Sequence, residues 1–290
     1  MPLTIGFLGA CNTLMWGGWV KAFEQRLTDT GWKIGDDISI EYKWANGLEK
    51  NYTKWATYFA KKNVNVIVTG GTQCTLACKQ AAAKATPPIP VVFATAGDPI
   101  DTKLVPGNLT GQSNQQTNLV IKRLDILRQF PDDNKTVGLI GNDQSANVML
   151  EMKIAERVAP LFGLKVHKGF IRKKQDIARV IKDLKAKKVK RLLVCTDPLI
   201  TTHAVKLHKE ARGLVTVHAF KEYVQNGGTI SYGSKFDKLF ENAADMVTAI
   251  LRGQGVAANI PVGGSDFECC IPQIPPIPIP ASLAAIAVPV

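Results

Sequence analysis

Short apolar runs that end in small polar residues recur along the chain. Val91–Ala94 is the clearest of them, because the absence of alternating polar positions predicts a strand buried on both faces. Pro90 and Pro99 bracket this stretch, and proline does not continue a central strand. Thr95–Asp98 follow the carboxyl end of the strand, which is where ligands bind in open α/β sheets. We expect these residues to form one wall of a closing cleft.

Apolar runs and helical spacings alternate through the first third of the chain. Strands are predicted over residues 3–8, 38–44, 64–68 and 91–94, helices near 19–27, 51–62 and 73–85, and an extended crossing strand over 108–113. This alternation is typical of a parallel sheet with helices on both faces. Right-handed crossovers then bring the carboxyl ends of the strands to one edge of the sheet.

The same alternation starts again after residue 113. Strands are predicted over residues 136–140, 164–170, 191–195, 215–219 and 229–232, and helices over 119–130, 146–162, 177–184, 200–211 and 236–251. The predicted fold class is therefore α/β, with two doubly wound parallel-sheet lobes joined by a hinge. The expected lobes are residues 1–112 plus about 233–258, and residues 113–232 plus part of 259–290.

Residues 271–280 carry a proline at nearly every other position and form neither a helix nor a central strand. We expect an extended Pro-rich segment. Its remaining residues are mostly apolar, which favours a segment packed over the surface, and a recognition motif for a partner is the alternative.

The charge changes this picture little. The net charge of +12 would suit a nucleic acid or an anionic surface. However, the basic clusters between Lys165 and Arg191 contain neither interleaved aromatic residues nor a recognisable DNA-recognition helix. We therefore interpret them as solvated faces and expect no nucleic-acid partner.

No apolar run of about 18 residues predicts a membrane span. Leu3–Leu8 resembles a strand and not a signal peptide, so the chain is expected to be cytoplasmic or an exported form whose signal has been removed.

The cysteines and histidines show no metal-ligand spacing, and Gly70-Gly71 is not a dinucleotide fingerprint. We therefore expect no metal and no cofactor.

Polar residues and helix starts follow the predicted strands of both lobes, and this mixture suits an amino-acid ligand. Its carboxylate would bind backbone N–H groups at a helix N-terminus, and its ammonium would bind Asp98 or Asp197. Each residue alone is equally well explained as a helix N-cap, but the whole set favours a site. The predicted ligand-binding residues are Asn12, Trp16, Thr72, Thr95, Ala96, Asp98, Asn142, Gln144, Ser145, Thr196, Asp197, Phe220 and Tyr232.

Aromatic side chains in both lobes are candidates to clamp an aromatic or apolar ligand. Trp16 lies beside Gly17-Gly18, so a site role and a core role stay equally open for it, whereas Trp19 is expected in the core. Phe220, Tyr223 and Tyr232 are the corresponding candidates in the second lobe and the hinge.

Four segments together resemble the ABC-transporter substrate-binding protein family that includes tryptophan- and tyrosine-binding members. They are Val91–Pro99, Asn108–Gly111, Thr196–Leu199 and Gly227–Gly233, and the likeness extends over most of residues 3–260. The resemblance implies a type I periplasmic-binding fold, a small ligand between the lobes, export, a membrane permease as partner and no catalysis. The chain departs from the family at Phe267–Cys270, which runs directly into the proline-rich segment.

Two other functions compete with this interpretation. Cys11-Asn12-Thr13 and Cys195-Thr196 are similar to the two cysteine segments of aspartate/glutamate racemases, in which a thiolate on each side of the substrate exchanges the α proton. The effector-binding core of a transcription regulator shares the fold, but it requires a DNA-binding segment before Leu3. We predict a monomeric, periplasmic or otherwise extracytoplasmic solute-binding component of an ABC importer that is not an enzyme and binds an aromatic or apolar amino acid.

Overall fold

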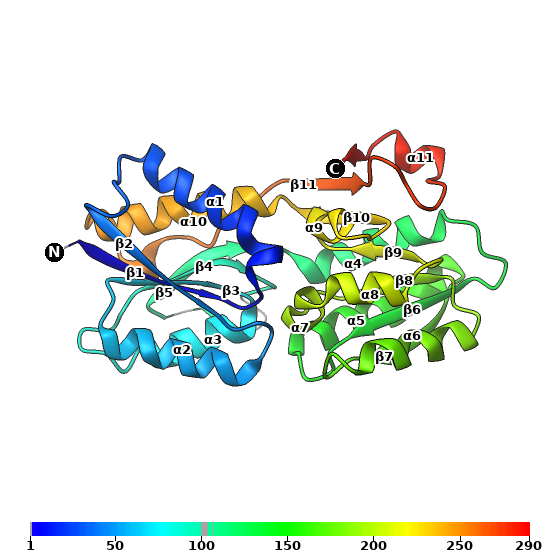
Figure 1. Ribbon diagram of the computed structural model, residues 1–290, viewed down its shortest axis with the longest axis horizontal. Coiled ribbons are helices and arrows are strands. Elements are labelled where there is room, and N and C mark those ends of the chain that lie inside the picture. Colours follow the sequence, from blue (N-terminus) through cyan, green and yellow to red (C-terminus); the bar gives the residue numbers. More distant parts are fainter. Residues whose placement is uncertain (1, 100–103, 106) are drawn as a thin grey trace. The chain divides into compact units, whose positions relative to one another are not determined.

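A computed structural model describes residues 2–99, 104–105 and 107–290, and these residues form two compact units. Unit 1 contains residues 1–114 and 235–265, and unit 2 contains residues 115–234 and 266–290. The chain therefore passes between the units at 114–115, at 234–235 and at 265–266. The predicted α/β class is confirmed, because both units are mostly parallel sheets with helices (Figure 1).

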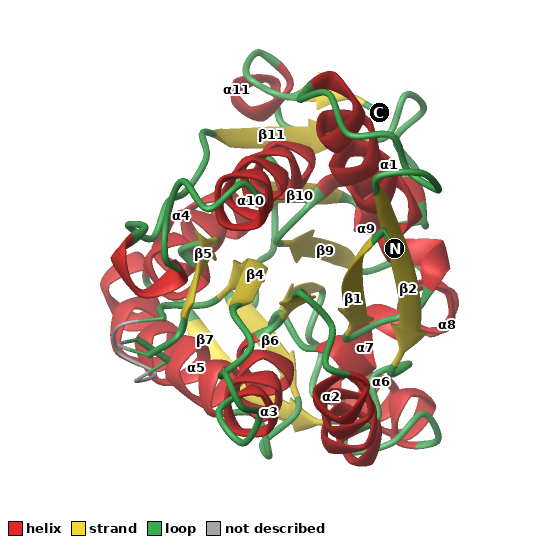
Figure 2. Cartoon of the chain, turned by 90° about the vertical axis from the view of Figure 1, so that its left-hand side faces the viewer, coloured by secondary structure: helices red, strands yellow, loops and turns green. Residues whose placement is uncertain are grey.

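Unit 1 has a five-stranded parallel sheet in the order β2-β1-β3-β4-β5. Helices α2 and α3 pack together on one face of this sheet, and α1 and α10 pack together on the other (Figure 2). The strands are β1 (Leu3–Gly9), β2 (Ile38–Trp44), β3 (Val66–Gly70), β4 (Val91–Ala96) and β5 (Leu109–Ser113), and the helices are α1 (Thr13–Asp29), α2 (Glu49–Lys62), α3 (Thr72–Ala82), α10 (Phe236–Leu251) and a 3₁₀ turn (Ala257–Asn259).

Unit 2 has a seven-stranded sheet in the order β12-β11-β10-β9-β8-β6-β7, in which only the β10–β11 pair is antiparallel. The strands are β6 (Thr136–Gly141), β7 (Lys165–Phe170), β8 (Arg191–Val194), β9 (Val215–His218), β10 (Ile230–Ser234), β11 (Phe267–Ile271) and β12 (Val288–Pro289). The helices are α4 (Gln116–Arg128), α5 (Ala146–Val158) with the 3₁₀ turn Ala159–Phe162, α6 (Asp176–Ala186), α7 (Pro198–Thr202), α8 (Ala204–Glu210), α9 (Lys221–Gln225) and α11 (Ala281–Ala284).

Two apolar clusters cover the opposite faces of the unit 2 sheet. One joins α4 and α5 to the strands and includes Leu124, Val148 and Leu283. The other joins α6, α7 and α8 to the sheet and includes Ile177 and Leu207. Residues 272–280 form no helix or strand, and Ile277 and Ile279 pack on the first cluster. The burial of both faces explains why the central strands contain continuous apolar runs.

β4 is buried along its whole length, as the apolar run predicted, and it continues to Ala96. β3, in contrast, begins and ends two residues later than the predicted strand over 64–68. Thr69 fits inside this buried strand because its hydroxyl donates to the Leu8 carbonyl over 2.9 Å.

The helix predicted over residues 200–211 is wrong, because the structure has two short helices that meet at His203. The hydroxyl of Thr202 donates to the Pro198 carbonyl over 2.8 Å, and such bonds to the residue four positions earlier bend helices. His203 follows with φ of −113°, outside the helical range, and α8 starts after it.

Among the described residues, no helix combines the length and the apolar character that crossing a membrane requires.

Candidate functional site

In unit 1, three loops that follow strands meet at the carboxyl edge of the sheet. Asn12 follows β1 and caps α1, since its side chain accepts a hydrogen bond from the Met15 N–H over 3.3 Å. Thr72 starts α3 after β3, and its hydroxyl oxygen accepts from the Gly97 N–H over 3.2 Å. The Thr95 hydroxyl accepts from the Asn114 amide over 2.7 Å. These bonds hold the loops after β3 and β4 in fixed positions.

Asp98 ends this loop in a left-handed backbone conformation, with φ of 41°. A non-glycine residue adopts this region at some cost, which aspartate and asparagine tolerate better than most residues. Its side chain is 9% exposed, and Ala96 is fully buried two residues earlier. The structure thus places Thr72, Thr95, Ala96 and Asp98 together, and their contact with a ligand stays a prediction.

Trp16 lies in the first turns of α1, and its indole packs among other aromatic rings. The ring centroids are 5.6 Å from Phe240, 5.8 Å from Trp19 and 6.3 Å from Trp44. The tip of the indole also lies over the end of β3, because a Cβ added to Gly70 would be 2.9 Å from Trp16 Cη2. Trp16 is therefore part of the unit 1 core and also reaches the carboxyl edge of the sheet. Trp19 is in the core, as predicted.

In unit 2, the loop after β6 contains three predicted residues. The Asn142 side chain accepts a hydrogen bond from the Gln144 N–H over 3.1 Å, and the Asn142 carbonyl accepts from the Ser145 N–H over 3.0 Å. Ser145 is buried, Asn142 is half-buried and Gln144 is exposed. Asn142 therefore shapes the turn that leads into α5.

Asp197 is a helix cap. Its Oδ1 accepts hydrogen bonds from the Leu199 and Ile200 N–H groups over 2.9 and 3.3 Å, and Pro198 occupies the first position of α7. The interpretation of this residue as a cap is therefore confirmed, and its predicted contact with the ammonium group stays a prediction.

A buried polar network adjoins Thr196, at the carboxyl end of β8, and the sequence patterns did not indicate it. Thr196 Oγ1 donates to Gln116 Oε1 over 3.1 Å, and Arg123 Nη2 donates to the same oxygen over 2.5 Å. Glu151 Oε1 accepts from the Thr196 N–H over 3.3 Å. Arg123 Nε donates to the Tyr232 carbonyl over 2.9 Å. The network therefore links the end of β8 and the middle of β10 to α4 and α5.

Arg123 and Glu151 form the charged centre of this network, with 3.6 Å between Nη1 and Oε2 and no exposed side-chain surface. Burial lowers the pKa of Arg123, and the Glu151 carboxylate opposes that shift. The sequence contained one indication that Arg123 is buried. Its spacing on α4 places it on the same inward face as Val120 and Leu127. Nothing in the sequence pairs Arg123 with Glu151.

Only one of the two polar atoms of the Gln116 side-chain amide has hydrogen-bond partners among the described residues. Two donors fix Oε1, so the orientation of the amide is defined, and the side chain is 2% exposed. Gln116 Nε2 is buried and has no acceptor among the residues that the structure describes. A buried donor of this kind is costly unless it has a partner. The arrangement therefore suits an incoming oxygen atom beside Thr196.

The other predicted aromatic residues have mainly structural partners in unit 2. The Phe220 ring is 4.6 Å from Tyr223, and Tyr223 stacks on His218 at 4.4 Å and 14°. Tyr232 is half-buried and packs against the α4–α5 cluster. Their predicted roles toward a ligand stay untested.

Within residues 2–99, 104–105 and 107–290, histidine, cysteine and carboxylate side chains do not gather in a group of three that would suit a metal ion.

Two doubly wound α/β units, connected by three crossings of the chain, define the type I periplasmic-binding fold. The chain belongs to the ABC transporter substrate binding protein family, whose model matches residues 18–271.

Three similar proteins illustrate this relationship. The tyrosine-binding protein of Clostridioides difficile is 26% identical over 254 residues, which are 85% of this chain and 71% of that protein. The ABC domain from Streptococcus pneumonia in complex with L-Trp has a TM-score of 0.87 at 19% identity, with 99% of this chain and 100% of that chain covered. A conserved domain protein from Vibrio cholerae has a TM-score of 0.90 at 21% identity, with 100% and 99% covered. The two solved structures share the fold.

Proposed function

We propose that this chain is the solute-binding component of an ABC importer and that its ligand is an aromatic amino acid. The main supporting observation is the set of polar residues at the carboxyl edges of both sheets. Trp16 lies beside them in unit 1, and in unit 2 the Nε2 atom of Gln116 has no acceptor among the described residues. Two similar proteins, named for tyrosine binding and solved with L-Trp, support the ligand class.

The proposed contacts follow from the chemistry of an amino acid. The α-carboxylate accepts from backbone N–H groups at the start of α3 in unit 1. In unit 2, Gln116 Nε2 is a candidate donor to a carboxylate oxygen. The ammonium group binds the Asp98 carboxylate. An aromatic side chain packs against the edge of Trp16, where offset or edge-to-face contacts between rings are favourable.

A thermal-shift screen over the twenty amino acids, with tagatose, inositol and glycerol as controls, tests the ligand class. A ligand that binds only the folded chain stabilises it and so raises its Tm. At a free ligand concentration of a hundred times Kd, the free energy of unfolding increases by about 2.7 kcal/mol. We expect tyrosine or tryptophan to give the largest shift, after bound ligand has been removed by unfolding and refolding. A shift with a sugar or polyol and none with amino acids would overturn the ligand class.

The racemase hypothesis lacks support from the thiols. Cys11 and Cys195 are both buried, and burial, followed by the charge of Glu151, raises the pKa of Cys195 well above its usual range. A racemase thiol requires the opposite shift, because the thiolate is the reactive form. We therefore propose that the chain is not an enzyme. The test measures exchange of the α proton of an amino acid in deuterated water. Exchange by the parent chain that is lost when both cysteines are replaced by serine would contradict this proposal.

We also propose that the chain acts outside the cytoplasm as a monomer, delivers its ligand to a membrane permease and binds no nucleic acid. The expectation that the lobes close on the ligand is a prediction. Small-angle X-ray scattering tests it, with a decrease of the radius of gyration on ligand addition as the expected result.

A further inference from the structure

β7 forms one end of the unit 2 sheet, and no strand pairs with its outer edge in the part of the chain that the structure describes. The Lys165 N–H donates to the Lys135 carbonyl over 2.8 Å, and the Ile171 N–H donates to the Gly141 carbonyl over 2.9 Å. Backbone groups alternate in direction along a strand, so Val166, Lys168 and Phe170 direct their N–H and C=O groups away from β6. These outward groups are a template for another strand.

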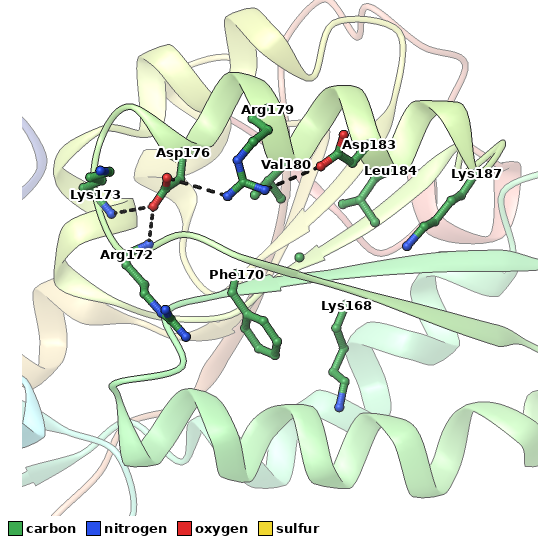
Figure 3. A pocket seen from close by; sticks show the side chains of 11 residues that line it. Lys168, Phe170, Arg172, Lys173, Asp176, Arg179, Val180, Asp183, Leu184 and Lys187 are labelled. Carbon is green, nitrogen blue, oxygen red and sulfur yellow. Dashed lines mark hydrogen bonds and ion pairs between the residues drawn. The ribbon is translucent and has the colours of Figure 1, made fainter.

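A groove of about 590 Å³ runs along this open edge, and we call it the β7–α6 groove (Figure 3). Phe170, Val180 and Leu184 give it an apolar lining. α6 approaches β7 closely, because a Cβ added to Gly169 would be 2.4 Å from Val180 Cγ1. Lys168 extends toward the other side of the edge, where it pairs with Glu156 of α5 over 2.8 Å.

The charges around the groove are mostly positive. Its lining contains the basic residues Lys168, Arg172, Lys173, Arg179 and Lys187 and the acidic residues Asp176 and Asp183.

Both acidic side chains are already engaged. Asp176 accepts from the Arg172 and Lys173 N–H groups over 3.0 and 3.1 Å, and Arg179 lies 3.5 Å from Asp183. Lys173 and Lys187 are exposed, and neither has an ion-pair partner among the described residues. The groove therefore presents uncompensated positive charge beside unpaired strand groups.

We propose that the β7–α6 groove binds an extended acidic segment of a partner protein, which pairs with β7 as an additional strand. The backbone of the segment forms hydrogen bonds with Val166, Lys168 and Phe170, and its carboxylates pair with Lys173 and Lys187. Strand addition of this kind obtains affinity from main-chain hydrogen bonds and specificity from side chains. Complementary charge raises the rate of encounter.

Two different roles of this edge would give different observations. Lysines on an edge strand also prevent aggregation, in which case no acidic peptide binds. A purely electrostatic surface binds any polyanion, but it leaves the backbone of β7 unpaired. Hydrogen exchange at individual amides separates these cases, because strand addition protects only the outward N–H groups.

The test uses the full chain and a fluorescein-labelled peptide, Asp-Val-Glu-Val-Asp-Val-Glu, with blocked ends. We expect saturable anisotropy at low ionic strength, and no binding of a peptide with lysine at each acidic position. On binding, exchange of the Val166, Lys168 and Phe170 amides slows at least tenfold, whereas exchange of the His167 and Gly169 amides, already directed to β6, changes little. Slower exchange is expected because it requires a hydrogen bond to open.

Two sets of variants separate charge from strand pairing. Lys173→Glu with Lys187→Glu should weaken peptide binding at least tenfold, and Lys50→Glu with Lys21→Glu, the same charge change on exposed residues of unit 1, should not. Lys168→Pro removes one outward N–H, and Lys168→Thr removes the same charge but keeps that N–H. Weaker binding to the proline variant than to the threonine variant supports strand addition.

The proposal fails if the peptide does not bind, or if it binds without protecting these three amides. An electrostatic surface would bind polyphosphate and the peptide equally well. The charge changes would abolish this binding, and Lys168→Pro would leave it unchanged. That set of results would also overturn the proposal. If Lys168→Pro does not fold, the exchange measurement on the parent chain still decides.

Discussion

At the scale of single residues, the two candidate partners for the ligand ammonium have different surroundings. Asp197 caps α7, while Asp98 has a left-handed backbone in the loop that follows β4. Asparagine retains the capping acceptor at position 197 and tolerates the backbone conformation at position 98. The two asparagine variants therefore remove a charge with little change in folding.

We expect Asp98→Asn to weaken amino-acid binding by about 1.5–3 kcal/mol, the contribution of a hydrogen bond to a charged group. Asp197→Asn should change affinity much less, and Asp197→Ala should lower the free energy of unfolding by about 1 kcal/mol through loss of the cap. Isothermal titration and urea denaturation measure the two effects. The reverse order of affinities would assign the ammonium to Asp197.

Gln116 provides a second test at this scale. Gln116→Glu keeps an acceptor for Arg123 and Thr196 but replaces the free donor with an oxygen. If Nε2 donates to the ligand carboxylate, affinity should fall by about 1–3 kcal/mol, because two acceptors then face each other. The matched variant Gln129→Glu changes an amide elsewhere in unit 2 and should leave affinity unchanged. Undiminished binding by Gln116→Glu would remove this residue from the proposed site.

Arg123 and Glu151 are expected to act as a unit. Arg123→Met leaves the Glu151 carboxylate buried without its main counter-charge, which should cost about 3–5 kcal/mol of unfolding free energy. Adding Glu151→Leu removes the stranded charge and should restore much of that loss. Urea denaturation of both single variants and the double variant measures the coupling. Additive losses would show that the two groups do not act as a pair.

At the scale of elements, the close approach of strand and helix explains why the end of β3 contains glycine. A Cβ at Gly70 would be 2.9 Å from both Trp16 Cη2 and Thr95 Cγ2. Gly70→Ala should therefore destabilise the chain by about 1–3 kcal/mol, the usual cost of overpacking. Reducing the indole with Trp16→Phe in the same chain should relieve part of that cost, which thermal denaturation can measure. No relief would place the strain at Thr95 instead.

The apolar pattern was sufficient to predict most of these helices and strands. It was insufficient where hydrogen bonds of polar side chains determine the structure. Val91–Ala94 predicted β4 because burial on both faces requires a continuous apolar run. The break at His203 was not predictable from that pattern, since it coincides with a hydroxyl bond to Pro198. Gln116 could not be predicted for a similar reason, because its partners Arg123 and Thr196 come from separate elements that only the tertiary fold brings together.

At the scale of the whole molecule, two buried histidines couple the stability of unit 2 to pH. His208 Nε2 lies 3.1 Å from His218 Nε2, and His208 Nδ1 lies 2.6 Å from the Asn226 carbonyl. Burial lowers the pKa of both histidines below the ordinary value of 6.5, and for His218 the charges of His208 and Arg123 lower it further. The folded chain therefore holds both imidazoles neutral where the unfolded chain already binds protons.

Stability should then be constant above about pH 6.5 and fall as the pH decreases from there toward the lowered pKa values, because the unfolded state binds more protons in this window. We expect the Tm to decrease between pH 6.5 and pH 5. The double variant His208→Gln, His218→Phe keeps an aromatic ring against Tyr223 and removes both titrating groups, so its Tm should depend less on pH in this interval. His203, whose pKa burial also lowers, remains in both chains and serves as an internal control. An equally steep decrease in both chains would assign the acid sensitivity to groups other than this pair.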